Sequence, residues 1–104
     1  MKTKFKKSGY SSEIANEYIN NKKAIRCLST ELDPQYKFID KKRTEDIACF
    51  IAWFTQEGLP PFKVKFKSQI TLTGYMSIIQ FKNLEACEVN YNVYFIADDI
   101  VEVK

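Results

Sequence analysis

The chain lacks several residue types on which catalytic and metal sites depend. It contains no histidine, and its three glycines are not clustered, so no glycine-rich phosphate loop is present. The cysteines at 27, 49 and 87 form no C-x-x-C pair that could begin a zinc site. A G-x-S-x-G motif and an Asp/Glu cluster with metal-ligand spacing are also missing. We therefore predict a protein that is not an enzyme, has no metal or cofactor, and keeps its cysteines as buried thiols in a reducing compartment.

Long apolar segments are missing as well. No run approaches the roughly 18 apolar residues of a membrane-spanning helix, and the start, MKTKFKKSGY, lacks the apolar segment of a secretion signal. We expect a cytoplasmic protein without a membrane partner, in which residues 1–10 are a flexible basic arm. A length of 104 residues, 45% of them hydrophobic, predicts a single folded domain over residues 1–104.

Positive charge is concentrated in the first two thirds of the chain. Residues 1–67 hold 14 Lys and Arg against 8 Asp and Glu, a balance of +6, whereas residues 68–104 hold 2 against 5, a balance of −3. The two add to the net charge of +3. This asymmetry suits a protein that presents one face to a polyanion.

The residue pattern predicts one short helix followed by strands. Ser12 can cap a helix that ends near residues 20–21. The stretch FKVKFK alternates strictly between apolar residues and lysines, which is typical of a strand with one buried face. Further strands are predicted in the segments 24–30, 35–39, 69–74, 76–81 and 87–103.

The segment 44–56, TEDIACFIAWFTQ, fits two structures. As a helix it would be capped by Thr44 and would place Ile47, Phe50, Ile51 and Phe54 on one stripe. As a strand it has the continuous apolar pattern of a central strand, and a hairpin to residues 62–67 favours this structure. We expect a mainly β fold, a small OB-like barrel of five to six short strands with one short N-terminal helix. A helix at 44–56 would make it an α+β fold instead.

Two basic groups and two aromatic rings are candidates for a binding site. Alternate residues of a strand lie about 6.6 Å apart on one face, so Lys63, Lys65 and Lys67 can follow a nucleic-acid backbone; outward lysines also protect edge strands from aggregation. A second basic group lies in the predicted turn before residue 44. Tyr36 and Trp53 are the rings that we expect to stack on bases, although core packing is the other common role of such rings. The predicted nucleic-acid-binding residues are Tyr36, Lys41, Lys42, Arg43, Trp53, Lys63, Lys65 and Lys67.

Two segments resemble known families. The stretch STELDPQYKFIDKKRTEDIACFIAWF resembles the first hairpin of bacterial single-stranded DNA-binding proteins, with matches at Leu32, Asp33, Pro34, Tyr36, Thr44, Phe50 and Ala52. The stretch NVYFIADDIVEV resembles the C-terminal strand of small accessory proteins of conjugative elements. The first resemblance implies a five-stranded oligonucleotide-binding barrel. The segment KSQITLTGYMSII has no counterpart in that family.

These observations predict a protein that binds single-stranded DNA, or RNA, without strong sequence preference, as an accessory to replication or transfer of a mobile element such as a plasmid or phage. A host or replication protein is a further expected partner, and the sequence does not determine the oligomeric state. The alternative is a protein-binding inhibitor or interaction module of phage or plasmid origin, for example one that blocks a host nuclease. Its acidic stretches at 85–88 and 98–102 would then contact a basic partner surface.

Overall fold

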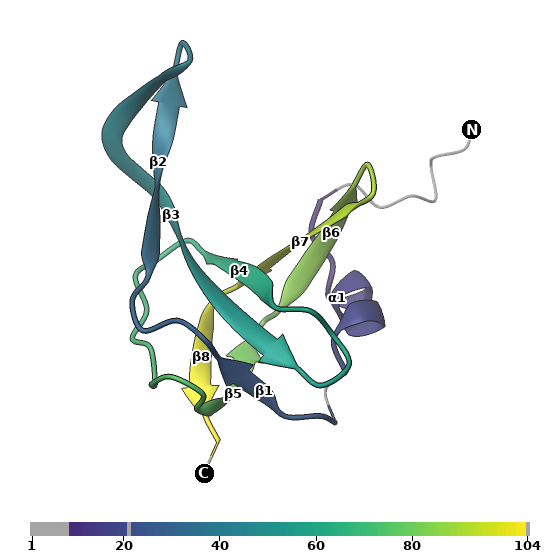
Figure 1. Cartoon of the computed structure of the whole chain (residues 1–104). Coiled ribbons are helices and arrows are strands. Elements are labelled where there is room, and N and C mark those ends of the chain that lie inside the picture. The colour runs from purple at the N-terminus through teal and green to yellow at the C-terminus, as the bar shows by residue number, and fades with distance from the viewer. Residues whose placement is uncertain (1–8, 21, 104) are drawn as a thin grey trace, which may run out of the picture.

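The computed structural model describes residues 9–20 and 22–103. Apart from Gly9 and Tyr10, the predicted basic arm lies outside the described residues. The fold is mainly β with one short helix, as predicted (Figure 1). The elements are α1 (Ser12–Tyr18), β1 (Ile25–Cys27), β2 (Asp33–Ile39), β3 (Lys42–Gln56), β4 (Phe62–Phe66), β5 (Ile78–Lys82), β6 (Glu85–Val89), β7 (Asn92–Ala97) and β8 (Asp99–Glu102).

Helix α1 begins one residue earlier than its sequence signal. Ser11, not Ser12, is the N-cap, and its Oγ accepts a hydrogen bond from the backbone N–H of Glu13. The helix buries Ala15, and Ile19 just beyond its end is also buried. Ser11 is fixed on the other side as well, because its backbone exchanges two hydrogen bonds with Ala86 of β6. The helix is thereby attached to the edge of the sheet.

The ambiguous segment 44–56 is a strand, and the helical alternative is wrong. It belongs to β3, which pairs antiparallel with β4 in the predicted hairpin, with Trp53 opposite Lys63. Burial alternates with a period of two in its C-terminal half, where Ala52, Phe54 and Gln56 are buried and Trp53 is exposed. Periodicity alone fitted both a helix and a strand. Pairing with β1 on one edge and β4 on the other shows that this half is a strand.

The remaining strands curl the sheet into an OB-like shape. The C-terminal half of β3 has β1 on one edge and β4 on the other, and β4 pairs in parallel with β7. Two antiparallel pairs, β6–β7 and β5–β8, follow each other as one bent ribbon, interrupted at residues 83–84 and at Asp98, and β5 returns to pair with β1. If β5 with β6 is counted as one long strand and β7 with β8 as another, five strands form the curl. The predicted barrel is not closed, because β6 and β8 at the two ends of the strand order are not neighbours.

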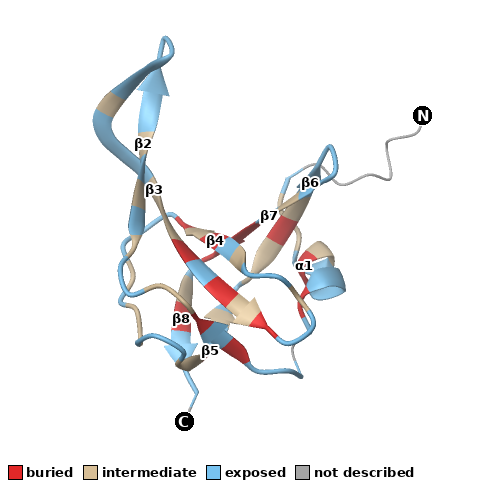
Figure 2. Cartoon of the chain, in the orientation of Figure 1, coloured by how far each residue is buried: buried red, intermediate tan, exposed pale blue. Residues whose placement is uncertain are grey.

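The core lies inside this curl. Phe54 is fully buried, with ring centroids 6.3 Å from Phe62, 6.2 Å from Phe66 and 4.8 Å from Phe81. Figure 2 shows buried residues gathered in the body of the molecule and hardly any in the upper part of β2 and β3. The body is therefore stabilised by packing that the upper part lacks.

Residues 33–49, made of β2 and the first part of β3, form a hairpin that projects from the body (Figure 1). From here on this hairpin, not the basic segment 1–10, is called the arm. β2 pairs only with β3 among the described strands. Its register with β3 shifts twice, between Gln35 and Tyr36 and between Tyr36 and Phe38, and such bulges increase strand twist. At the tip, Asp40 and Lys41 both have positive φ, as in a two-residue hairpin turn.

Three details differ from the prediction. The described chain has eight strands, not five to six, because the final ribbon is interrupted and the arm adds β2. Residues 69–74 form no strand, because β5 takes the place beside β1, although Ile70 and Leu72 pack on the core. All three cysteines are free, but only Cys27 is buried; Cys49 and Cys87 are half-buried.

Candidate nucleic-acid interface

Lys63 and Lys65 of the FKVKFK stretch share the outer face of the sheet. Val64 and Phe66 are buried in the core, so the alternating residues Lys63 and Lys65 point outward. Lys63 and Lys67 are exposed, and Lys65 is half-buried. Among the described residues, none of the three lysines pairs with a carboxylate. The ion pair between Lys23 and Glu57 lies outside this group. The row on this face therefore consists of Lys63 and Lys65, and Lys67 follows just beyond the end of β4.

Trp53 lies directly beside this row. Its backbone N–H donates to Ser29 Oγ (2.8 Å), and its carbonyl accepts from the N–H of Leu28 (2.9 Å). Because both backbone groups point toward β1, Trp53 and Lys63 form a non-hydrogen-bonded pair across β3 and β4, in which side chains come closest. The indole is 43% exposed. The sheet thus holds a partly exposed ring next to a cation.

Lys65 occupies the inner part of the same face. Its Nζ lies 5.1 Å from the ring centroid of Tyr10, in cation–π range. Hydrogen bonding with Tyr10 raises the pKa of Lys65, against the opposing effect of partial burial. The ammonium therefore stays charged throughout the neutral pH range. A half-buried ammonium with an aromatic neighbour and no carboxylate partner is a suitable anion site.

A hollow of about 380 Å³ opens over these residues. Ile51 and the lysines at 63 and 65 form one side, and Tyr94 with its β7 neighbours forms the other. Tyr94 is 43% exposed, so it offers a second ring across the hollow from β3. The lining residues are Tyr10, Ile51, Lys63, Lys65, Asn92, Val93, Tyr94 and Phe95.

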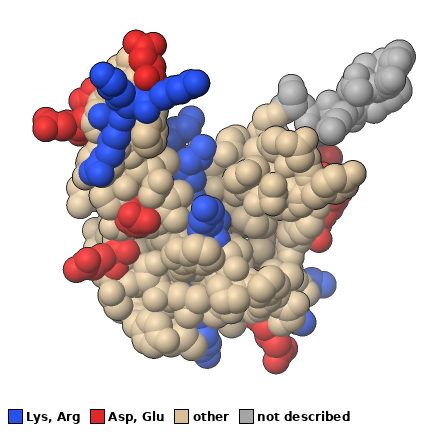
Figure 3. Space-filling model, turned by 45° about the horizontal axis from the view of Figure 1, so that its top comes forward, with Lys and Arg blue, Asp and Glu red and all other residues tan. Residues whose placement is uncertain are grey.

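The hollow is part of a longer groove between two projections of the molecule. In Figure 3 the arm stands on one side and the β6–β7 ribbon on the other, with Lys and Arg side chains along the groove between them. Asp and Glu side chains lie toward the flanks in this view. The groove therefore presents positive charge along its length, which is how proteins follow the backbone of a single strand.

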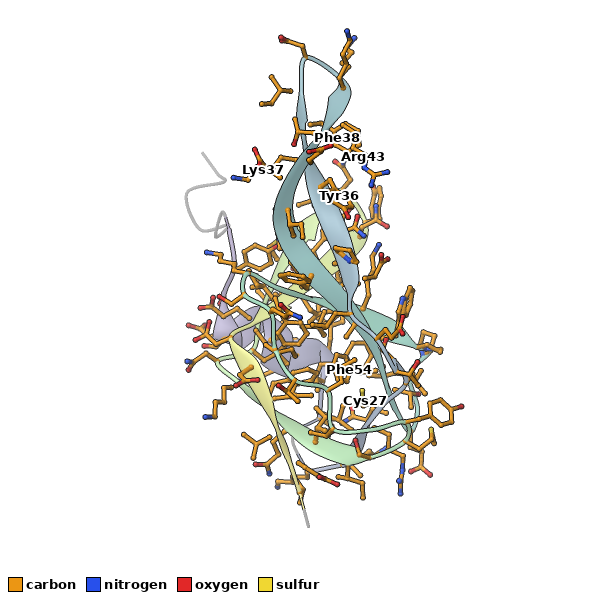
Figure 4. All side chains as sticks on the ribbon, turned by 90° about the vertical axis from the view of Figure 1, so that its left-hand side faces the viewer. Cys27, Tyr36, Lys37, Phe38, Arg43 and Phe54 are labelled. Atoms are coloured by element: carbon orange, nitrogen blue, oxygen red, sulfur yellow. The ribbon has the colours of Figure 1, made fainter. Side chains whose placement is uncertain are left out.

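The second predicted basic group lies on the arm. Lys41 is in the tip turn, while Lys42 and Arg43 are the first residues of β3, not turn residues as expected. The Arg43 guanidinium lies over the Tyr36 ring, 4.1 Å from its centroid. Figure 4 shows these two side chains on one side of the arm and Lys37 on the other.

The arm does not bring the two predicted rings together. Tyr36 pairs with Ile47, six residues before Trp53 along β3, so the two rings are about 20 Å apart along the strand. Tyr36 is half-buried and largely covered by Arg43. The predicted residues therefore form two clusters, one on the body (Trp53, Lys63, Lys65 and Lys67) and one on the arm (Tyr36, Lys41, Lys42 and Arg43).

Sequence reasoning missed the tyrosines of the groove. Tyr10 comes from the segment before α1 and Tyr94 from β7, and both reach the site through contacts between distant parts of the chain. The run VYFIA in NVYFIA is continuously apolar, so periodicity gave no signal that the ring at position 94 points outward. The parallel pairing of β4 with β7 carried no local signal.

The acidic stretches make contacts within the molecule. The Tyr18 hydroxyl donates to the Glu88 carboxylate, an interaction that raises the pKa of Tyr18. The Asn83 amide donates to the Asp98 carboxylate, and Asp99 Oδ1 accepts from the backbone N–H of Ile100. These carboxylates have local structural partners, which gives the protein-inhibitor alternative no particular support.

Comparison of the chain with protein-family models, with curated proteins and with solved structures finds no match. Among the described residues, no helix has the length and apolar character needed to cross a membrane.

Proposed function

We propose that this protein is a non-enzymatic, cytoplasmic binder of single-stranded nucleic acid, and that the groove over β4 is its binding site. The lysines at 63, 65 and 67 would neutralise successive phosphates. Trp53, which is opposite Lys63 on β3, and Tyr94, which lines the hollow from β7, would stack on bases. Stacking and phosphate contacts do not depend on base identity, so weak sequence preference is expected.

The observation that carries this proposal is the half-buried ammonium of Lys65, which lies beside the Tyr10 ring in the hollow that Tyr94 also lines and has no carboxylate partner among the described residues. Lysines are mostly exposed, and a lysine that is buried usually pairs with an acid. Here the cation is placed on the floor of an open groove on the central strand β4, which has β3 on one edge and β7 on the other. Protection of an edge strand therefore does not account for it.

The architecture supports the same site. In OB-like barrels the ligand lies on the second and third strands, between the connection of strands 1 and 2 and that of strands 4 and 5. In this chain the corresponding strands are β3 and β4, the first connection is the arm, and the second is the turn of the β6–β7 ribbon. The basic groove lies between these two projections (Figure 3).

Titration with oligothymidine tests the proposal directly, because Trp53 is the one tryptophan of the chain. Binding in the groove should quench its fluorescence, and the logarithm of the affinity should fall linearly with the logarithm of salt concentration. Lys65→Gln should lower the magnitude of that salt slope by about 0.7 for a single strand.

A matched control is Lys82→Gln, because Lys82 is an exposed lysine of β5 outside the groove. Its salt slope should equal that of the natural protein. Binding that is insensitive to salt, or a Lys65→Gln slope identical to that of the control, would exclude the groove as the site. No quenching at low salt, together with a stable complex with a host nuclease, would support the inhibitor alternative.

A further inference from the structure

The tip of the arm exposes apolar side chains that a groove for a single strand does not need. Phe38 and Ile39 are 68% and 61% exposed and lie at the end of β2, far from the hydrophobic core. Arg43, which is opposite Phe38, comes ten residues before Trp53 on β3, so the tip is up to about 33 Å from Trp53 along the strand. Large apolar side chains at the end of a projecting hairpin are typical of an interaction surface.

The two faces of the tip have the same composition. Phe38 is opposite Arg43 in the register with β3, and Ile39 is opposite Lys42. Because neighbouring strand residues point to opposite faces, each face carries one apolar side chain and one cation. Residues 37–43 hold four cations and one carboxylate, a balance of +3. The tip is therefore a two-sided apolar wedge with positive charge on both sides.

We propose that this tip, Lys37–Arg43, acts as a pin at the junction between single-stranded and double-stranded nucleic acid. At such a junction two strands leave the duplex on opposite sides, and each presents an unstacked base face and a phosphate backbone. The apolar residues would contact the terminal base pair, as apolar wedges do when they enter a base stack. Arg43 and Lys42 would each contact one of the departing backbones.

The position of the tip agrees with this role. The arm is one wall of the basic groove (Figure 3), and β3 runs without interruption from the tip to Trp53, which is opposite Lys63. A strand held in the groove would thus leave the duplex at the tip. The inference rests on the proposed function, since it assigns the duplex end of the same binding site.

The test compares two labelled DNAs of equal single-strand length, plain oligothymidine and an oligothymidine that ends in a forked duplex, with 2-aminopurine in the terminal base pair. We expect the natural protein to bind the fork at least about fivefold more tightly than the plain strand, the lower bound for one stacking contact. It should also increase 2-aminopurine fluorescence, because the terminal pair becomes unstacked.

The double variant Phe38→Ser/Ile39→Ser should lose the preference for the fork and the 2-aminopurine signal, and should bind plain oligothymidine as the natural protein does. Phe38→Leu/Ile39→Leu keeps the tip apolar and should retain both. Val101→Ser, at an exposed apolar residue of β8, is the control for a general change in surface hydrophobicity. Thermal unfolding of each variant checks that the body is intact.

The outcomes separate the two proposals. If the natural protein does not bind oligothymidine, the proposed function itself fails. If it binds but shows no preference for the fork, or if the serine variant weakens both DNAs equally, only the pin is wrong. Binding of the tip to vesicles of anionic lipid, lost in the serine variant, would assign the wedge to a membrane surface and would also overturn the pin.

Discussion

The two halves of β3 belong to one strand but have very different surroundings. Near its C-terminal end, Ala52 and Phe54 are fully buried, and the backbone is paired on both edges with β1 and β4. Near its N-terminal end, residues 42–48 pair only with β2, and no residue among them is buried. One strand therefore contributes to both the core and the arm.

The difference in burial separates a packed half of β3 from a half with few buried contacts. A two-stranded hairpin is marginally stable in water by itself, so the arm depends on its continuity with the body for order. Segments with few buried apolar contacts open locally at low free-energy cost. The body half of β3 can hold Trp53 in a fixed position, whereas the arm half can adjust to a ligand.

Of the substitutions considered, one in the core should change the protein most, by lowering its stability. Phe54→Ala should lower the free energy of unfolding by about 3–5 kcal/mol, because it leaves a cavity among three packed rings. Ile47→Ala, on the same strand but in the arm and 44% exposed, should cost less than about 0.5 kcal/mol. Urea denaturation followed by far-UV circular dichroism measures both. Equal losses would show that the arm is as tightly packed as the body.

A smaller effect is expected on binding. Trp53→Ala should weaken the affinity for oligothymidine by about 1–3 kcal/mol, because a stacking ring on a rigid strand is lost. Tyr36→Ala should weaken it less, since Arg43 already covers that ring. Fluorescence anisotropy of labelled oligothymidine measures both variants, with Tyr75→Ala as the control at an exposed ring outside the hollow. A larger loss for Tyr36→Ala would move the main contact to the arm.

The smallest effect concerns the arm alone. Arg43→Gln removes the contact with the Tyr36 ring, and an exposed cation–π pair contributes about 0.5–1 kcal/mol. Amide hydrogen exchange should become faster for residues 36–47 and stay unchanged for residues 52–56. Acceleration in both ranges would mean that the arm and the body unfold together, which contradicts the division described above.

Much of this fold could be predicted from local patterns. The alternation in FKVKFK correctly placed Lys63 and Lys65 on one face, and the loop containing Gly58 and the prolines correctly indicated the β3–β4 hairpin. The Tyr36–Arg43 contact also joins two of the predicted binding residues, which lie seven positions apart in the chain. These features depend on residues close in the chain, where turn chemistry and periodicity carry the information.

The rest depends on contacts that local patterns do not encode. Residues 69–74 have the alternation of a strand, yet their side chains pack on the core without a partner strand. The placement of Tyr10 and Tyr94 beside Lys65 requires the parallel pairing of β4 with β7. The shape of the arm follows from two bulges, and no sequence motif predicts them.

The β4–β7 pairing also determines when the site can form. Val64 must find Phe95, 31 positions later in the chain, and such distant pairings form late in folding because closing a long loop is entropically costly. During synthesis, the floor of the groove would leave the ribosome well before its opposite wall. A nascent chain that has not yet reached Asn92 would thus carry Lys63 and Lys65 without β7 and its Tyr94, so the second side of the hollow can form only after β7 has been made.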